Sequence, residues 1–497
     1  MLPEVSSAAS SVGSSPRQPQ TEQTAATTSD LLQPAHLDRR EFVAAGGVML
    51  TGSVASGGTG GEGSREDPAS HPQQHRGVSS FPRSRPPRRS RPPEKRLAVV
   101  TTVYYYLSHA YHIVGRFLDG YLREDGYHFP SFGVASVYVE QVRKNDLSRE
   151  LAQEHGFRLS PTIEDALTLG TGKLAVDGVL LIGEHGDYPY NAKGQKLYPR
   201  YEYFQQIVAV FEKSGRSVPV FCDKHLSYDR KKAAAMVATA KNMGFPLMAG
   251  SSLPVTWRRP ELELPLGTPM REALVASRGE LEIYGIHALE ALQCMVERRF
   301  RVGEKGGANQ GVRAVTCLQG DAVWQAGDRG HWSWELLEHA LGRSLSRNAG
   351  DIRANCRRFP RPTNWGNFVP GPIAFLIEYA DGLRATVLQL DGHVADETFA
   401  VRCAQPSRIE SCLFYLPPPP GAAFLEALTR HIERFLETGH PPYPVERTLL
   451  TGGILDYALE SRIQNSRRLE TPDLSDIRYD PPADSGFIRG DYALPVR

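Results

Sequence analysis

Three features are scarce in this sequence of 497 residues: paired cysteines, long apolar runs and an excess of charge of one sign. The six cysteines are scattered and none belongs to a CxxC pair, so a structural zinc site of the usual kind is not expected. No segment is apolar over the roughly 20 residues that a membrane-spanning helix needs. The net charge of +1 creates no strong field that would select nucleic acid or an anionic membrane. We therefore expect no integral membrane segment, no nucleic-acid partner and a small polar molecule as the ligand.

Residues 1–95 differ in composition from the rest of the chain. They are rich in Ser, Gly, Pro, Gln and Arg and poor in aromatic residues, which predicts a disordered extension. Within them, DRREF (38–42) precedes a weakly apolar stretch, a pattern that resembles a twin-arginine export signal. The prediction is an exported, periplasmic protein, in which Cys403 and Cys412 could pair. A chance match in low-complexity sequence would leave the protein cytoplasmic.

From residue 96 the hydrophobic pattern alternates between strands and helices. Buried strands are predicted at RLAVVTTV, FGVASVYVE, VDGVLLIG and SVPVFCDK, with helical patterns between them. Parallel strands need such crossovers, so we expect 96–250 to be a Rossmann-like nucleotide-binding domain built on a doubly wound α/β sheet. Beyond it, the Asp381-Gly382 turn between alternating runs predicts a hairpin. We expect 251–475 to be an α+β substrate and oligomerisation domain with an open, mainly antiparallel sheet, and 476–497 to be a C-terminal tail.

Lys224 stands at the carboxyl end of one of the predicted parallel strands. Ligands of such sheets bind in the crevice at that edge, where an ammonium group can polarise a carbonyl or exchange protons. The alternative is a lysine that only caps the strand at the surface.

Several runs resemble, in their order, the Gfo/Idh/MocA family, which includes glucose-fructose oxidoreductase and inositol dehydrogenase. They are DLSRELAQEHGFRLSPTIEDAL, VDGVLLIG, DKH, KAAAMVATAKNMGFPLMAG and GIHALEALQCMV, and the resemblance covers roughly residues 96–475. It implies an oxidoreductase that acts on a sugar or polyol with NAD or NADP. It also implies a homo-oligomer formed through the C-terminal sheet.

The same resemblance implies catalytic roles for three residues. The family's lysine beside the nicotinamide lies in a Glu-Lys-Pro triplet, whose place is taken here by a triplet centred on Lys224. Its acid/base histidine lies in a G-x-H-x-x-D pattern, which is matched by a run containing His287 and Glu290. A three-residue step puts these two side chains on one helix face, so the carboxylate is expected to orient the ring. The alternative is a core histidine with no catalytic role.

The family's glycine fingerprint, G-x-G-x-x-G-x-x-H, is missing after the first strand. The equivalent positions are Thr101, Val103, Tyr106 and His109, and none is glycine. Their side chains would stand where the diphosphate normally lies, although amides at the helix N-terminus could still attract an anion. If a dinucleotide binds, the expected contacts are Thr101, Thr102, Tyr106 and Ser108 in the loop, Glu140 at the adenosine ribose and Glu184 under the nicotinamide ribose.

The stretch GEHGDYP (183–189) also departs from the family pattern. With Asp223, His225 and His109 nearby, it is dense in groups that bind metals or move protons. If a metal is present, His185, Asp187 and His225 would be ligands suited to Zn, Mn or Fe. A hydrogen-bonded polar crevice without metal is the favoured interpretation.

Three functions stay open at this point. The first is the nicotinamide-dependent sugar or polyol oxidoreductase. The second keeps the fold and drops the dinucleotide, giving a cofactor-free or metal-assisted carbohydrate lyase, epimerase or hydrolase. The third is an exported sugar-binding protein without turnover. We favour the first, because a resemblance over most of the chain outweighs one defective loop.

Overall fold

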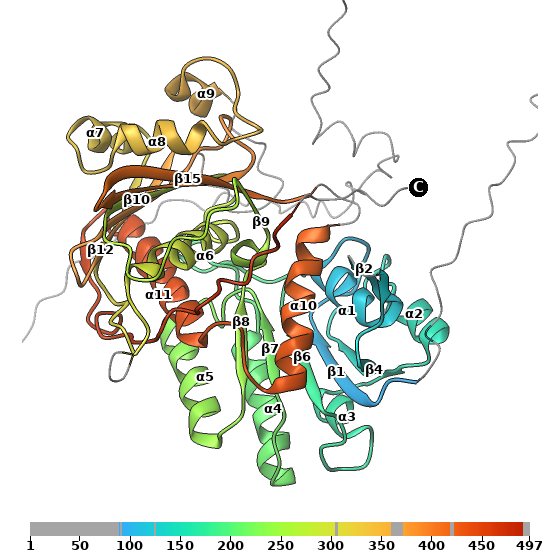
Figure 1. Ribbon diagram of the computed structural model, residues 1–497. Coiled ribbons are helices and arrows are strands. Elements are labelled where there is room, and N and C mark those ends of the chain that lie inside the picture. The colour runs from blue at the N-terminus through green and yellow to red at the C-terminus, as the bar shows by residue number, and fades with distance from the viewer. Residues whose placement is uncertain are drawn as a thin grey trace, which may run out of the picture. The chain divides into compact units, whose positions relative to one another are not determined.

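The first of two sheets in the fold has six strands, all within residues 95–250 (Figure 1). The computed structural model describes residues 89, 92–123, 126–303, 307–358, 371–417 and 422–490. All pairings in this sheet are parallel. Its central strands consist largely of buried residues, as a sheet covered on both faces requires. The predicted doubly wound α/β architecture is confirmed. In spatial order the strands are β5 (Arg158–Leu159), β4 (Phe132–Val139), β1 (Lys95–Thr101), β6 (Gly178–Ile182), β7 (Val220–Asp223) and β8 (Leu247–Gly250).

The order of these strands places a switch point beside β1. Ranked along the chain, the six strands run 3-2-1-4-5-6 across the sheet, because β1 pairs with β4 on one side and with β6 on the other. At such a point the loops that follow the two neighbouring strands diverge and leave a crevice, where ligands of this fold class bind.

Helices cover both faces of this sheet. α3, α4 and α5 pack on the face that carries Ala98 and Val100, whereas α1 and α10 pack on the face of Leu97 and Val99. α10, which is far from the first sheet in sequence, thus completes the helical layer on this face of the sheet (Figure 1). The helices are α1 (His109–Asp119), α2 (Ser148–His155), α3 (Ile163–Thr168), α4 (Arg200–Ser214), α5 (Arg230–Met243) and α10 (Ala423–Thr438), and a small hairpin joins β2 (Tyr121–Arg123) to β3 (Gly126–His128).

A second sheet of eight strands is mainly antiparallel, as predicted; only β10 and β13 pair in parallel. The predicted hairpin at Asp381-Gly382 joins β12 to β13, and Gly382 adopts φ 93°, a left-handed conformation that favours glycine. In spatial order the strands are β16 (Leu469–Glu470), β11 (Val312–Gln319), β12 (Ile373–Tyr379), β13 (Arg384–Gln389), β10 (Met270–Ser277), β14 (Glu397–Ala404), β15 (Ser407–Tyr415) and β9 (Trp257–Arg259).

This second sheet also lies between two layers of helices (Figure 1). α6 and α11 cover one face, and α7 and α8 lie on the other, where α8 packs on β10, β14 and β15. A homo-oligomer formed through this sheet stays a prediction. The elements are α6 (Gly285–Val296), α7 (Asp321–Asp328), α8 (Trp334–Leu341), α9 (Ile352–Arg358), α11 (Val445–Ile463) and the 3-10 turns η1 (Leu253–Val255) and η2 (Glu297–Arg299).

The expected pairing of Cys403 with Cys412 is wrong. In the β14–β15 ladder Cys403 lies opposite Arg408 and Cys412 lies opposite Phe399, so the register separates the two thiols. All six cysteines are free and buried.

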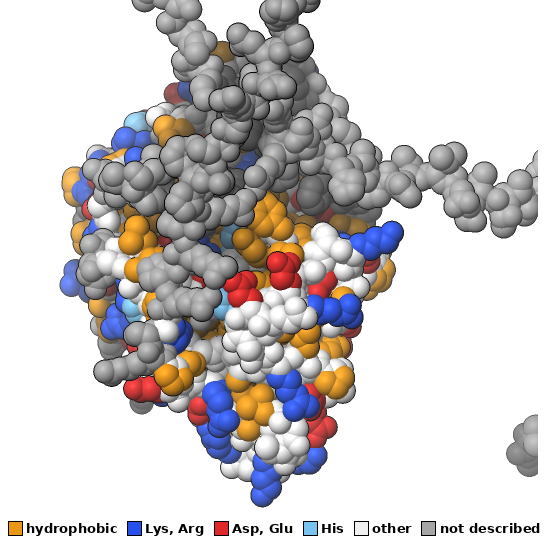
Figure 2. All heavy atoms as spheres, turned by 90° about the vertical axis from the view of Figure 1, so that its right-hand side faces the viewer, with side chains coloured by type: hydrophobic (Ala, Val, Ile, Leu, Met, Phe, Trp, Pro, Cys, Tyr) orange, Lys and Arg blue, Asp and Glu red, His pale blue; other side chains and the backbone are white. Residues whose placement is uncertain are grey.

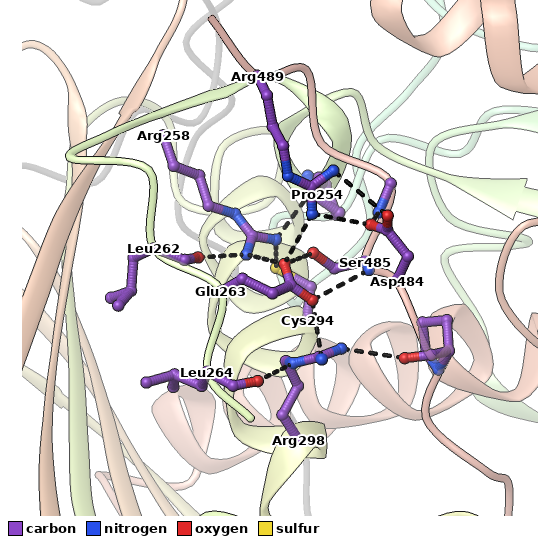
Figure 3. Close-up of polar contacts among 12 residues, drawn as sticks. Pro254, Arg258, Leu262, Glu263, Leu264, Cys294, Arg298, Asp484, Ser485 and Arg489 are labelled. Carbon is purple, nitrogen blue, oxygen red and sulfur yellow. Dashed lines mark hydrogen bonds and ion pairs between the residues drawn. The ribbon is translucent and has the colours of Figure 1, made fainter. Parts of the chain in front are cut away.

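The C-terminal strap, residues 482–490, is held by polar contacts with the buried Arg298 and with Glu263, which accepts from the Ser485 hydroxyl (Figure 3). Arg298 donates to the carbonyls of Pro482 and Ala483 at 3.0 and 3.3 Å and forms an ion pair with Glu263 at 2.8 Å. The amide of Ile488 donates to the carbonyl of Val255 at 3.1 Å, directly beyond the first sheet's last strand.

Acidic, basic and hydrophobic side chains all occur on the face of the described chain shown in Figure 2, which agrees with the net charge of +1. Among the described helices, none has both the length and the apolarity needed to cross a membrane. The twin-arginine-like motif at 38–42 lies outside the described residues.

Candidate active site

Lys224 lies at the centre of a buried charge cluster at the carboxyl edge of the first sheet. It follows β7 with φ 60°, and its amide donates to the carbonyl of Gly250 at 3.2 Å. Its Nζ atom donates to Oε1 of Glu184 at 2.8 Å, and the other oxygen of this carboxylate is paired with Arg200. Burial by itself would raise the pKa of Glu184, but the positive charges of Lys224 and Arg200 lower it well below its usual value. Lys224 is therefore an ammonium held in place by a carboxylate, rather than a surface cap.

His109, the first residue of α1, forms a dyad with Asp223, the last residue of β7. Their Nδ1 and Oδ2 atoms lie 2.6 Å apart, and the Asp223 side chain is 1% exposed whereas that of His109 is 20% exposed. An ionised carboxylate only accepts hydrogen bonds, so this contact assigns a hydrogen to Nδ1, and in the neutral ring the lone pair is then on Nε2. The ring is thus oriented and has its accepting nitrogen available.

His287 lies near this cluster but is oriented by a different residue from the one predicted. Its Nδ1 atom lies 2.5 Å from Oγ of Ser251, which directly follows β8. Burial, and then the positive charge of Lys224, lower the pKa of His287 well below its usual value, so the ring is neutral.

The expectation that Glu290 orients His287 is wrong. Oε1 of Glu290 accepts from the Thr451 hydroxyl at 2.6 Å, because α11 offers a buried hydroxyl to a carboxyl that is itself fully buried. Oε2 of Glu290 would lie 3.2 Å from a Cβ on Gly250, which places the carboxyl beneath the end of β8. Burial raises the pKa of Glu290 above its usual value.

Three residues that were predicted to contact the cofactor use their side-chain hydroxyls for hydrogen bonds within the protein. Thr101 donates to the carbonyls of Val103 and Ile182, both at 3.0 Å, and Thr102 donates to the carbonyl of Glu184 at 2.7 Å. Ser108 caps α1, since its Oγ accepts from the amide of Tyr111 at 3.1 Å. The loop after β1 is therefore fastened to the end of β6 rather than open.

The three tyrosines of this loop point in different directions. Tyr104 is 1% exposed in the core of the first sheet, and its carbonyl accepts from the amide of Leu147 at 2.8 Å. Tyr105 is half-buried with its ring 5.8 Å from that of His185, and Tyr106 is 55% exposed.

His185 lies beside His109 at the N-terminus of α1, where the diphosphate of a dinucleotide binds in this fold class. It has φ 67° and its ring centre lies 5.3 Å from that of His109, the first helical residue. Burial, and the nearby His109 ring, lower the pKa of His185 to about 3, so a neutral ring stands at this helix N-terminus. With the tied loop, this arrangement does not fit a dinucleotide bound in the usual way.

The predicted ribose and metal residues are not brought together. Glu140 is exposed and accepts from the Tyr188 hydroxyl, while Asp187 is exposed and pairs with Arg143. His225 is buried, with Nε2 lying 3.7 Å from Oε1 of Glu282. Within the described ranges, no group of three or more His, Cys, Asp or Glu residues could hold a metal ion.

Other residues of the site were missed by the sequence analysis. Glu280 and Glu282 lie just before α6, and Tyr190 approaches Glu280 with its hydroxyl 3.5 Å from Oε1. Burial, and the neighbouring Glu282, raise the pKa of Glu280 to about 7. Ser251 could have been found by the rule that singled out Lys224, because both directly follow a parallel strand.

The strand order makes the protein an α/β molecule of the Rossmann-like, doubly wound fold class, with a cluster of titratable side chains at the carboxyl ends of β1, β6 and β7. No protein-family model matches the chain, and no curated protein matches it.

Solved structures do match. GenD2 from gentamicin A biosynthesis, in complex with NAD, is 16% identical over 78% of this chain and 99% of its own, with a TM-score of 0.48. A probable dehydrogenase from Thermotoga maritima is 13% identical over 76% and 99%, with a TM-score of 0.45. The myo-inositol dehydrogenase from Lactobacillus casei, in complex with NAD(H) and myo-inositol, is 9% identical over 75% and 97%, with a TM-score of 0.45.

Proposed function

We propose that this protein is an enzyme that removes a proton from a carbon next to a carbonyl group of a sugar-like compound, without a dinucleotide. The observation that carries the proposal is the pairing of a fixed ammonium with an oriented base: Lys224 on Glu184, and His109 on Asp223. These are the two groups that enolate chemistry requires.

The step balances without a co-reactant. Nε2 of His109 takes the proton, the C–H electron pair moves into the bond toward the carbonyl carbon, and the carbonyl oxygen gains the negative charge. The Lys224 ammonium stabilises that charge, while Glu184 and Arg200 keep it in place. Delivery of a proton to the opposite face of the enolate completes an epimerisation. Loss of the hydroxyl on the next carbon, which takes the proton from His109 and leaves as water, completes an elimination.

A sugar-like substrate is supported by the groups around this edge. Glu280, Tyr190 and His287 offer hydrogen-bonding groups to hydroxyls. The pKa of Glu280 near 7 allows it both to accept and to donate close to neutral pH. The resemblance to sugar and polyol enzymes points the same way.

A nicotinamide-dependent oxidoreductase of sugars or polyols is the second candidate. The specific observation that favours it is the 3-2-1-4-5-6 strand order with Lys224 at the carboxyl edge. Two features count against this candidate. His185 lies beside the N-terminus of α1, and the loop after β1 is hydrogen-bonded to the end of β6, so the usual binding site of the diphosphate is not open.

Two experiments separate the candidates. A panel of ketoses, aldoses and uronates is incubated with the protein in D2O, and proton NMR follows deuterium entry at the carbon beside the carbonyl. We expect exchange that His109→Gln abolishes. Titration with NADH and NADPH, followed by nicotinamide fluorescence on protein stripped of ligand by unfolding and refolding, is expected to show no saturable binding. Micromolar binding without exchange would move the assignment to the oxidoreductase. Sugar-induced thermal stabilisation without either would indicate the non-catalytic binding protein.

A further inference from the structure

We infer that Ser251 fixes His287 as a hydrogen-bond donor at Nε2, so that the site holds two histidines of opposite tautomer and accepts an α-hydroxycarbonyl compound. This inference rests on the proposed function for its substrate, but its structural content stands on contacts that the proposed chemistry does not use.

The hydrogen of the Ser251 hydroxyl is directed to His287. Oγ of Ser251 accepts from the amide of Leu253 at 3.1 Å and lies 2.5 Å from Nδ1 of His287. Ser251 is 1% exposed, so water does not compete for its hydroxyl group. Among the contacts of the described residues, Nδ1 of His287 is the only acceptor beside Oγ, so donation to Nδ1 leaves no buried hydroxyl hydrogen without a partner.

A neutral imidazole carries only one ring hydrogen. His287 is kept neutral by burial and by the charge of Lys224, and its Nδ1 accepts from Ser251. Its hydrogen is therefore on Nε2, which makes the ring an electrophilic donor rather than a base.

His109 has the opposite arrangement. Its Nδ1 donates to the buried Asp223 carboxylate, so in the neutral ring Nε2 is the acceptor. Asp223, the partner of His109, directly precedes Lys224, whose amide donates to Gly250, the residue before Ser251, so the two rings are held from adjacent strand ends. One ring is thus fitted to take a proton and the other to hold an oxygen.

This division of roles selects a substrate with two neighbouring oxygens. The carbonyl oxygen accepts from Lys224, the hydroxyl oxygen on the adjacent carbon accepts from Nε2 of His287, and the hydrogen on this hydroxyl-bearing carbon goes to His109. Ser251 is a positioning residue in this scheme, because it acts through the His287 ring.

Nitrogen NMR of protein labelled with ¹⁵N-histidine tests the tautomers directly in the absence of substrate. His287→Gln and His109→Gln identify the two sets of signals by their loss. We expect Nδ1 of His287 to be unprotonated and its Nε2 protonated, with the reverse pattern in His109. A protonated Nδ1 in His287 overturns the inference, whatever the activity of the protein.

Matched variants keep the test specific. Ser251→Ala should abolish the fixed tautomer of His287 and leave the His109 signals unchanged, while Ser251→Thr should preserve both. Asp223→Asn should change the nitrogen signals of His109 and leave those of His287 unchanged. In the deuterium assay Ser251→Ala should slow exchange about 10- to 100-fold, and Ser251→Thr should restore most of it. Unchanged His287 signals in Ser251→Ala would also overturn the inference, and thermal unfolding of each variant shows whether it is folded.

If simple carbonyl compounds exchange deuterium as fast as α-hydroxycarbonyl compounds, the inferred substrate class is wrong. That result would not affect the inferred tautomers of His287 and His109. Failure of all exchange would instead count against the proposed function.

Discussion

Arg200 and Glu184 form an ion pair with side-chain exposures of 0% and 2%, and the same carboxylate also holds Lys224. One buried negative charge therefore balances two positive ones. This relationship fixes the site's ammonium and also ties α4 to the end of β6.

Arg200→Met is expected to lower the free energy of unfolding by about 2 to 3 kcal/mol, because Glu184 keeps its pair with Lys224 but one of its buried oxygens loses its partner. Urea unfolding measures the change. The matched control is Lys213→Met, which removes an exposed pair with Glu164 and should cost less than about 1 kcal/mol. Equal effects of the two variants would show that burial of the Arg200 pair carries no special weight.

Lys224→Met is expected to slow deuterium exchange by about 10²- to 10³-fold, since it removes the charge that stabilises the developing oxyanion. The fold should survive, because Glu184 keeps its pair with Arg200. Lys224→Arg, which retains a positive charge, serves as the comparison. Exchange at the wild-type rate in Lys224→Met would remove this residue from the mechanism.

His112 makes stability depend on pH in a predictable direction. Burial, and the nearby Arg116, lower its pKa to about 4, below the value of about 6.5 for an unfolded chain. The unfolded state therefore binds the proton first, and the stabilising contribution is complete above pH 6.5 and falls as the pH drops toward 4.

His112→Gln should remove this dependence. Between pH 7 and 5 the wild type is expected to lose about 2 kcal/mol relative to the variant in urea unfolding. The exposed His440, changed to Gln, should leave the pH profile as it is. A constant difference between wild type and His112→Gln would contradict the shifted pKa.

Arg298→Met should loosen the C-terminal strap, because Arg298 donates to the carbonyls of Pro482 and Ala483 (Figure 3). Hydrogen exchange measured by mass spectrometry should be faster in the peptide that contains Ile488. Arg489→Met, which alters a half-exposed side chain, should change it much less. Equal protection in both variants would show that the strap is held elsewhere.

Export is tested by Arg39→Lys combined with Arg40→Lys, which should leave the protein in the cytoplasm of its own host. Unchanged fractionation of the double variant would refute the twin-arginine prediction.

The sequence predicts the two sheets well because their strands are either uniformly apolar or alternating, and periodicity is a local property. It also predicts Lys224, since a polar residue after a parallel strand faces the crevice in this fold class. The partners of His287 and Glu290 were missed because Ser251 and Thr451 lie on other elements, and only packing decides which hydroxyl reaches which side chain. For the same reason the three tyrosines after β1 look alike in sequence, although one is in the core and one is exposed.

The return of α10 to the first sheet has a consequence for biosynthesis. Leu428, Ile432 and Phe435 bury one face of strands that leave the ribosome long before them. Until α10 emerges, the nascent chain carries that apolar face uncovered while the whole second sheet is being made, which is the condition in which chaperones bind and aggregation begins. A fragment that stops after β8 should therefore be insoluble, although it contains every strand of its sheet.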